Sequence, residues 1–304
     1  MTDDYNARQP YSPLTQLAFL LLLAGGGIVF GSIITLVIAS ALLHVPMLNL
    51  ADELLKPENV QVSRLLQIAA TFFYMATPAI IFSFIVSRKP FAALDFGKRI
   101  NSTQIMWVVA IAVIALILGG ALGELNSMIP IPDTWAAKFK AMEDEYNKQV
   151  LALSSMHTVA DYIISLLLIA LLPAIFEEMF FRGAMQQVFI KLFGNALSGI
   201  LLTSIIFSAI HLSYYGFLPR LFLGMMLGYV FYYSKNLWLN ILAHFLNNAI
   251  ALTQMYILSR QGKLNEESMN DTFPLYYGLI AAVAFVWVFI QFRKKSEEVL
   301  SEAV

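Results

Sequence analysis

Long apolar stretches recur along the whole chain and are separated by short polar segments. A helix that crosses a bilayer needs about 20 apolar residues, because the hydrocarbon core is about 30 Å thick. By that measure the sequence predicts eight membrane-spanning helices, at residues 15–43, 65–87, 104–124, 159–182, 197–215, 218–234, 237–258 and 274–293. The end of the fourth is ambiguous, since its helical pattern could continue past Gly183 to Phe193. The predicted fold class is an all-α polytopic membrane protein with a polar intramembrane cavity.

The one sizeable loop, residues 125–158, has a different pattern. Its apolar positions recur at helical spacing, at Trp135, Phe139, Met142 and Tyr146, opposite the charged positions Lys138, Glu143, Asp144 and Glu145. This pattern predicts an amphipathic helix that lies on the outer membrane surface. The alternative is a lid over an active site.

These segments divide the chain into four parts. They are a disordered cytoplasmic tail (1–13), three spans with the amphipathic helix (14–158), a core of four further spans (159–258), and a last span with its cytoplasmic tail (259–304). Basic residues gather in two places that lie on one side of the membrane if the spans number eight: Arg88, Lys89, Lys98 and Arg99, and then Arg293, Lys294 and Lys295. Positive charge favours the cytoplasmic side, so both termini are expected inside. In a bacterium this would be the plasma (inner) membrane.

Composition supports a membrane protein and excludes several other classes. Hydrophobic residues make up 59% of the chain and charged residues 13%, whereas soluble domains have about 45–50% and about 25%. The net charge of −1 and the lack of a long basic run argue against nucleic acid as a partner. The chain has no cysteine, which excludes disulfides, a thiolate nucleophile and a cysteine-based metal site.

Three groups of polar residues interrupt the later apolar stretches, where a charge at bilayer depth costs several kcal/mol, about 2.5–3.5 on insertion scales. They are Glu177, Glu178 and Arg182 in "FEEMFFR", Phe207 and His211 in "FSAIH", and His244 and Asn248 in "HFLNN". Each group has a simple structural interpretation, as a buried ion pair, an interhelical hydrogen bond or packing. Their concentration in one bundle favours a shared functional pocket.

Helix geometry predicts which of these groups meet. Glu178 and Arg182 are four residues apart and therefore neighbours, whereas Glu177 lies about 100° round the helix without a partner in its own segment. His211 is its expected partner, because both residues lie seventeen positions from a turn near Gly194. His244, counted from a turn near Ser234, is expected about 10 Å shallower than Glu177, a difference that tilt or a loop must absorb.

The ordered set EExxxR, FxxxH and HxxxN, with each motif on a separate span, resembles the CPBP family. This family comprises the CAAX prenyl endopeptidases and bacterial relatives named for bacteriocin processing and abortive infection (Abi). The resemblance runs from about Asp161 to Ala251. It implies an intramembrane endopeptidase that hydrolyses a peptide bond of a membrane-bound or lipidated peptide or protein, in contact with membrane lipid.

The residue types suit that chemistry. Glu177 is the predicted general base for water, His211 holds or polarises the same water, and His244 and Asn248 donate to the oxyanion. Glu178, Arg182 and Phe207 are predicted to support these residues.

The favoured mechanism requires no cofactor. The alternative is zinc, with Glu177, His211 and His244 as ligands. No histidine is followed by Glu, so the HExxH arrangement of two histidines and a base on one helix is absent.

Other functions remain open at this level. A rhomboid-type serine protease should show GxSG, and "NALSG" at 195–199 has Ala in place of the first Gly. A pair of intramembrane aspartates is absent, since Asp161 is the one Asp in any predicted span. A transporter also places Glu, His and Arg in the membrane, although no repeat symmetry is evident. A non-catalytic immunity or scaffold protein on the same bundle is the third alternative.

Overall fold

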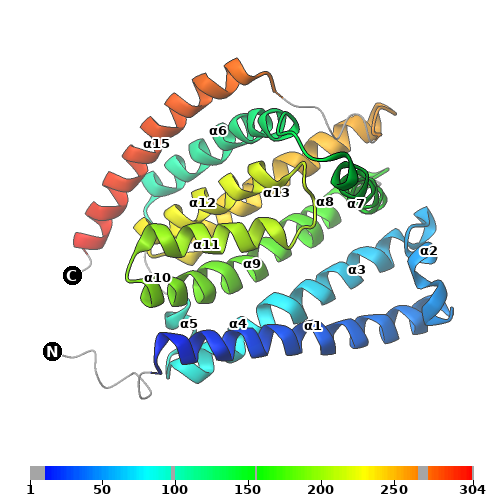
Figure 1. Ribbon diagram of the computed structural model, residues 1–304, viewed down its shortest axis with the longest axis horizontal. Helices are drawn as coiled ribbons and strands as arrows, with labels where there is room; N and C mark the ends of the chain where they lie inside the picture. Colours follow the sequence, from blue (N-terminus) through cyan, green and yellow to red (C-terminus); the bar gives the residue numbers. More distant parts are fainter. Residues whose placement is uncertain (1–10, 97–99, 155, 266–272, 303–304) are drawn as a thin grey trace.

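The computed structural model describes residues 11–96, 100–154, 156–265 and 273–302, and the elements of this part are helices (Figure 1). Residues 1–10 of the predicted tail lie outside the described residues, as do Lys98 and Arg99 of one basic cluster. Within the described part, six helices are long and apolar enough to cross a membrane: Pro13–Leu43, Pro57–Val86, Ser102–Ser127, Val159–Phe193, Leu237–Arg260 and Leu275–Ser301. Four of them are α1 (Pro13–Leu43), α6 (Ser102–Ser127), α13 (Leu237–Arg260) and α15 (Leu275–Ser301).

The two predicted spans that are not among these six long helices are also helical but shorter. They are α11 (Ala196–Ala209), which has 14 residues, and α12 (Phe217–Ser234), which has 18. All eight apolar segments therefore form helices, which confirms the all-α polytopic membrane fold. The fourth span does continue past Gly183, since its helix runs to Phe193.

Two of the long helices contain π-helical turns. Pro57–Val86 comprises a 3-10 turn (Pro57–Asn59), α3 (Val60–Thr71), a π turn (Phe72–Ala76) and α4 (Thr77–Val86). Val159–Phe193 comprises α8 (Val159–Ser165), a π turn (Leu166–Leu171), α9 (Leu172–Glu178), a second π turn (Met179–Gln186) and α10 (Gln187–Phe193).

Proline explains two of the three π turns. Pro78 and Pro173 each stand two residues after a π turn. A proline inside a helix lacks an amide hydrogen and clashes with the carbonyl four residues earlier, which here belongs to Tyr74 or Ile169. Both carbonyls lie within the π turns, so each turn widens the helix where the proline ring needs room.

Polar caps fix where the helices begin and turn. Side chains that accept a hydrogen bond from the first helical turn occur at Ser12, Asn101, Thr158, Asn195 and Asn236. Gly194 has a φ of 64°, which glycine adopts without strain, and it ends α10 directly before the Asn195 cap. The helical hairpin predicted near Gly194 is therefore confirmed.

The loop between α6 and α8 contains the predicted amphipathic helix, α7 (Asp133–Leu153). Its aromatic positions contact protein: the ring of Phe139 stacks on Tyr214 with centroids 4.7 Å apart. Glu143, expected on the solvated face, instead accepts a 2.7 Å hydrogen bond from Ser213. Thus α7 rests on the connection between α11 and α12 at the end of the bundle away from both chain termini (Figure 1). Its place relative to the membrane stays a prediction.

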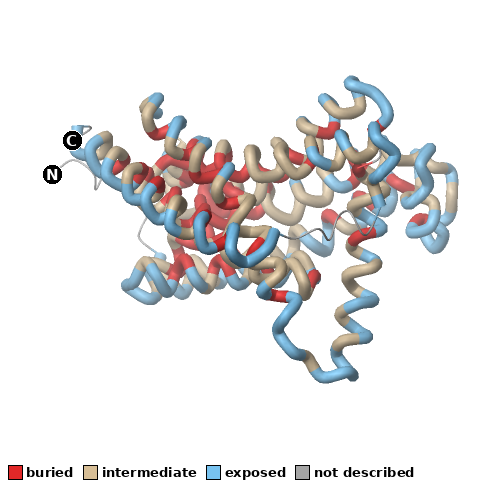
Figure 2. The backbone as a smooth tube through the Cα atoms, turned by 90° about the horizontal axis from the view of Figure 1, so that it is seen from above, coloured by how far each residue is buried: buried red, intermediate tan, exposed pale blue. Residues whose placement is uncertain are grey.

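Short helices complete the described chain, namely the 3-10 turn Met47–Asn49, α2 (Leu50–Leu54) and α5 (Pro90–Ala93). In the bundle, α15 packs along α6, and α11 packs against α10 and α12. Buried residues gather between the helices while exposed ones cover the outside (Figure 2). The largest buried apolar cluster contains Phe181, Phe207 and Phe231, so the polar motifs lie within the best-packed region.

Close packing of α1 generates the first prediction. A Cβ at Gly27 would meet the carbonyl of Phe73 and, at 3.0 Å, the ring of Pro78, whereas a Cβ at Gly26 would meet nothing within 4 Å. We expect Gly27→Leu to lower the free energy of unfolding by about 1–3 kcal/mol through overpacking. Gly26→Leu is the matched control. Thermal unfolding of the detergent-solubilised protein checks this, and equal melting temperatures for the two variants would contradict the packing.

Candidate active site

Two adjacent glutamates at the end of α9 have different environments. Glu178 is completely buried, while the side chain of Glu177 is 17% exposed. They stand directly before the π turn Met179–Gln186, and such turns are frequent at functional sites. Consecutive helical positions point about 100° apart, so the two carboxylates face different partners.

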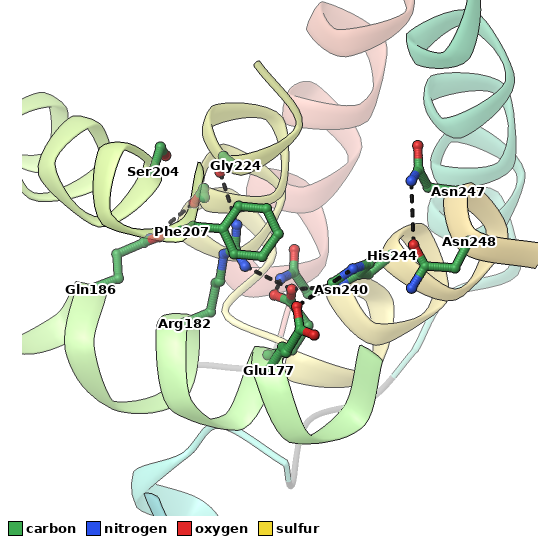
Figure 3. A network of polar contacts seen from close by, with 12 residues as sticks. Glu177, Arg182, Gln186, Ser204, Phe207, Gly224, Asn240, His244, Asn247 and Asn248 are labelled. Carbon is green, nitrogen blue, oxygen red and sulfur yellow. Dashed lines mark hydrogen bonds and ion pairs between the residues drawn. The ribbon is translucent and has the colours of Figure 1, made fainter. Parts of the chain in front are cut away.

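Glu178 is bonded to three buried side chains, those of Arg182, Asn240 and His244, which Figure 3 labels within one network of polar contacts. Its Oε1 accepts bonds of 2.7 Å from Arg182 Nη1 and from His244 Nδ1. Its Oε2 accepts a bond from Asn240 Nδ2. All four side chains are buried. The predicted neighbour relation of Glu178 and Arg182 is confirmed, but the pair is not self-contained, because Glu178 also binds two residues of α13.

Arg182 and Gln186 connect this network to α12. Arg182 Nη2 donates to the carbonyl of Gly224 at 3.1 Å, and Gln186 Nε2 donates to the carbonyl of Gly228 at 2.9 Å. A Cβ at either glycine would collide with α11, through Ser204 or Ile200. The two glycines therefore let α11 and α12 pack closely. The sequence analysis missed Gln186, although it continues the spacing of Glu178 and Arg182.

Asn240 is a second residue that the sequence analysis missed. It is fully buried and lies one helical turn before His244, so both side chains reach Glu178. The signal was present in the sequence as a polar residue at every fourth position of α13: Asn240, His244 and Asn248. Its Oδ1 and the Nε of Arg182 are buried and have no partner in the described part of the chain.

His244 lies between the two glutamates. Because the Glu178 carboxylate accepts, Nδ1 of His244 is the donor, and Nε2 lies 4.0 Å from Glu177 Oε2. The expected 10 Å difference in depth between Glu177 and His244 is therefore wrong. The turn that starts α13 is buried at Asn236 and Leu237 against the connection after α5, where Leu237 N donates to the carbonyl of Asp95 and Trp238 Nε1 to that of Phe96. The two hairpin turns thus cannot be taken as lying at one level.

The ring of Phe207 packs against the imidazole rings of both His211 and His244. Its ring centroid is 5.2 Å from that of His211 and 5.9 Å from that of His244, and the Arg182 guanidinium lies 4.9 Å above it. His211 Nδ1 lies 2.8 Å from the Phe207 carbonyl. A carbonyl only accepts, so Nδ1 carries the hydrogen, and the neutral ring keeps its lone pair on Nε2. Glu177 accepts no hydrogen bond from any described residue, and its one ion contact is with His244.

Asn248 shares the face of α13 with His244 but has other contacts. Its Nδ2 lies 3.5 Å from the carbonyl of Ala170, in the first π turn of the fourth span, and its Oδ1 accepts from Asn247 at 3.4 Å. Among the described residues, no hydrogen bond joins Asn248 to Glu177, His211 or His244.

The donors named in the zinc alternative all belong to the described residues. Glu177, His211 and His244 supply ligand types that suit zinc. Among the described residues, however, no group of three or more such side chains is arranged to hold a metal ion. His211 directs Nδ1 to a backbone carbonyl and His244 directs Nδ1 to Glu178, and such bonds leave Nε2 of each ring as the nitrogen that could bind a metal ion.

Comparison with known proteins agrees with the polar motifs. A family model described as "Type II CAAX prenyl endopeptidase Rce1-like" matches residues 159–250, which is less than a third of the chain but includes every motif residue described above. Neither the comparison with curated proteins nor that with solved structures finds a match. Residues 159–250 of this integral membrane protein are therefore similar to the Rce1-like family of CAAX prenyl endopeptidases.

Proposed function

We propose that this protein hydrolyses a peptide bond of a membrane-associated substrate with a water activated by Glu177. The observation that carries the proposal is the contrast between adjacent carboxylates. Glu178 accepts hydrogen bonds from Arg182, Asn240 and His244, whereas Glu177 accepts no hydrogen bond from a described residue. A carboxylate without protein donors is available to take a proton from water and to pass it to the leaving amine.

The histidines suit complementary roles in this proposal. His211, with Nδ1 bonded to the Phe207 carbonyl, offers the Nε2 lone pair to the same water. His244, when doubly protonated, keeps one N–H on Glu178 and offers the other from Nε2, on the side of Glu177. That N–H and the Asn248 amide are the proposed donors to the tetrahedral oxyanion.

Glu178 and Arg182 act as a rigid frame in this mechanism. They fix the ring of His244 through Glu178 Oε1 and tie the helix of Glu177 to α12 through the carbonyl of Gly224. Preorganised donors contribute most when they need no rearrangement during the reaction. Phe207 supports the frame by packing between the two imidazoles.

We further propose a membrane-bound or lipidated peptide or protein as substrate and a cytoplasmic location for both termini. The first part rests on the family description, which names a CAAX prenyl endopeptidase. The second rests on the basic residues Arg88 and Lys89, between α4 and α5, and 293–295, in the C-terminal part of α15. Figure 1 shows α5 and the C-terminal end of α15 on the side of both termini.

Replacement of Glu177 tests the base directly. We expect Glu177→Gln to reduce cleavage by about 10²–10⁴-fold, because the amide cannot take a proton, and to leave the melting temperature unchanged. The assay uses protein in nanodiscs and a quenched-fluorescent peptide that ends in a farnesylated CAAX sequence. A variant that still cleaves would exclude Glu177 as the base, and substrate flux without peptide products would indicate a transporter.

Replacement of Arg182, unlike that of Glu177, should lower stability as well as activity. Arg182→Gln leaves the buried Glu178 carboxylate without its cation, and breaking a buried pair costs about 3–5 kcal/mol. We therefore expect both thermal stability and activity to fall. Glu177→Gln is the matched control, and unchanged melting of Arg182→Gln would show that the pair does not hold the bundle.

Metal dependence is tested by chelation. Because the proposed base acts on water without a metal, we expect cleavage to be unaffected by 1,10-phenanthroline and purified protein to contain much less than one zinc per chain. Elemental analysis and activity before and after chelation provide the measurement. Stoichiometric zinc together with loss of cleavage on chelation would establish the zinc-dependent mechanism instead.

A further inference from the structure

A cavity of about 620 Å³ lies beside the candidate active site, between α6, α7, α12 and α13. Its apolar wall includes Leu116, Phe222 and Met255, and its polar wall includes Asn147 and Arg220. A volume of about 300–1,000 Å³ with few polar groups is typical of a ligand pocket. The proposed mechanism uses neither Arg220 nor α7, so this cavity needs its own explanation.

The cavity is connected to the site through α13 and the α11–α12 connection. Asn247, which lines it, donates a hydrogen bond to the proposed oxyanion donor Asn248. Arg220, in the first turns of α12, is close enough to His211 for its charge to act on that ring. A group held at Arg220 would therefore lie near the residues assigned to hydrolysis.

Arg220 is a cation without a counter-ion in the described part of the chain. The faces of its guanidinium are covered: the group lies 5.2 Å from the centroid of the Tyr146 ring, and a Cβ at Gly216 would collide with it. Its Nε and Nη2 are buried and have no hydrogen-bond partner among the described residues. Buried donors without partners are costly, and the planar guanidinium edge matches a carboxylate.

The other charges that line the cavity already have partners. Lys140 donates to Asp144 at 3.1 Å, and Glu143 accepts from Ser213 at 2.7 Å. The charged residues of the cavity wall are thus two cations, Arg220 and Lys140, and two anions, Glu143 and Asp144. A phosphate group carries more charge and is usually bound by several donors, so this balance favours a single monoanionic carboxylate.

We propose that this cavity binds a carboxylate of the peptide substrate and that Arg220 is the residue that selects it. This inference rests on the proposed function and adds a specificity determinant to it. Tyr146 connects the site to α7, so the predicted amphipathic helix forms part of the binding wall.

The test measures binding separately from hydrolysis. The protein carries Glu177→Gln and is held in phosphatidylcholine nanodiscs. Fluorescence anisotropy measures the binding of a labelled farnesylated CAAX peptide in two forms, one with a free C-terminal carboxylate and one with a C-terminal carboxamide. We expect the acid to bind about ten- to a hundredfold more tightly, since a hydrogen bond to a charged group contributes about 1.5–3 kcal/mol. Arg220→Gln should abolish that difference.

The chain offers matched controls. Arg293 also lies over a tyrosine ring, 4.8 Å from Tyr233, but is paired with Glu297 and does not line the cavity. Arg293→Gln should keep the preference for the acid. Gly119 lines the cavity and a Cβ there meets no atom within 4 Å, as at Gly25 in α1. Gly119→Leu should weaken both peptides, whereas Gly25→Leu should weaken neither.

Three results would overturn the inference: equal binding of acid and amide, a preference that survives Arg220→Gln, or no binding of either peptide. A preference that disappears when phosphatidylglycerol is added to the nanodiscs would assign Arg220 to lipid phosphate and also overturn it. Anisotropy reports binding and not turnover, so the result stays interpretable while the labelled peptide is recovered intact. Cleavage of that peptide by Glu177→Gln would instead count against Glu177 as the base, which separates failure of the proposed function from failure of this inference.

Discussion

The central constraint on this bundle is the burial of a carboxylate and a guanidinium among apolar helices. Moving two such charges out of water is expensive and is compensated only when geometry and additional hydrogen bonds are good. Here Glu178 receives donors from Arg182 on its own helix and from Asn240 and His244 on α13, while Arg182 also reaches a carbonyl of α12. Three helices must therefore meet in one register, and that register brings the ring of His244 to Glu177.

The same constraint explains why the interior is built from small residues and widened turns. Gly224 and Gly228 let α11 approach α12, which keeps the carbonyls of both glycines within reach of Arg182 and Gln186. Pro173 and the π turn before it alter the helix one turn ahead of the two glutamates, and the second π turn follows directly after them. Irregular helix is thus concentrated where the polar groups lie.

The different roles proposed for Glu178, as a positioning group, and for Glu177, as a base, follow from their neighbours. A carboxylate that accepts three hydrogen bonds is a good positioning group but a poor base, because most of its lone pairs are occupied. A carboxylate with few partners can accept a proton. On the other side of α13, the cavity under α7 carries an arginine whose faces are covered and whose edge has no counter-ion among the described residues. Catalysis and selection of the substrate would then be separated by one helix.

The sequence by itself determined the apolar helices, the hairpin at Gly194 and the three polar motifs, because hydrophobic length, a left-handed glycine and i, i+4 spacing are local properties of the chain. It did not determine that Glu178 rather than Glu177 bonds His244, or that Asn240 and Gln186 belong to the network. Those outcomes depend on the relative depth and rotation of α9, α12 and α13. Depth counted from a turn fails when the turn itself is buried against another part of the chain, as at Leu237. Only the tertiary structure decided which donors met which carboxylate, since hydrogen-bond partners between helices are fixed by packing and not by spacing along one helix.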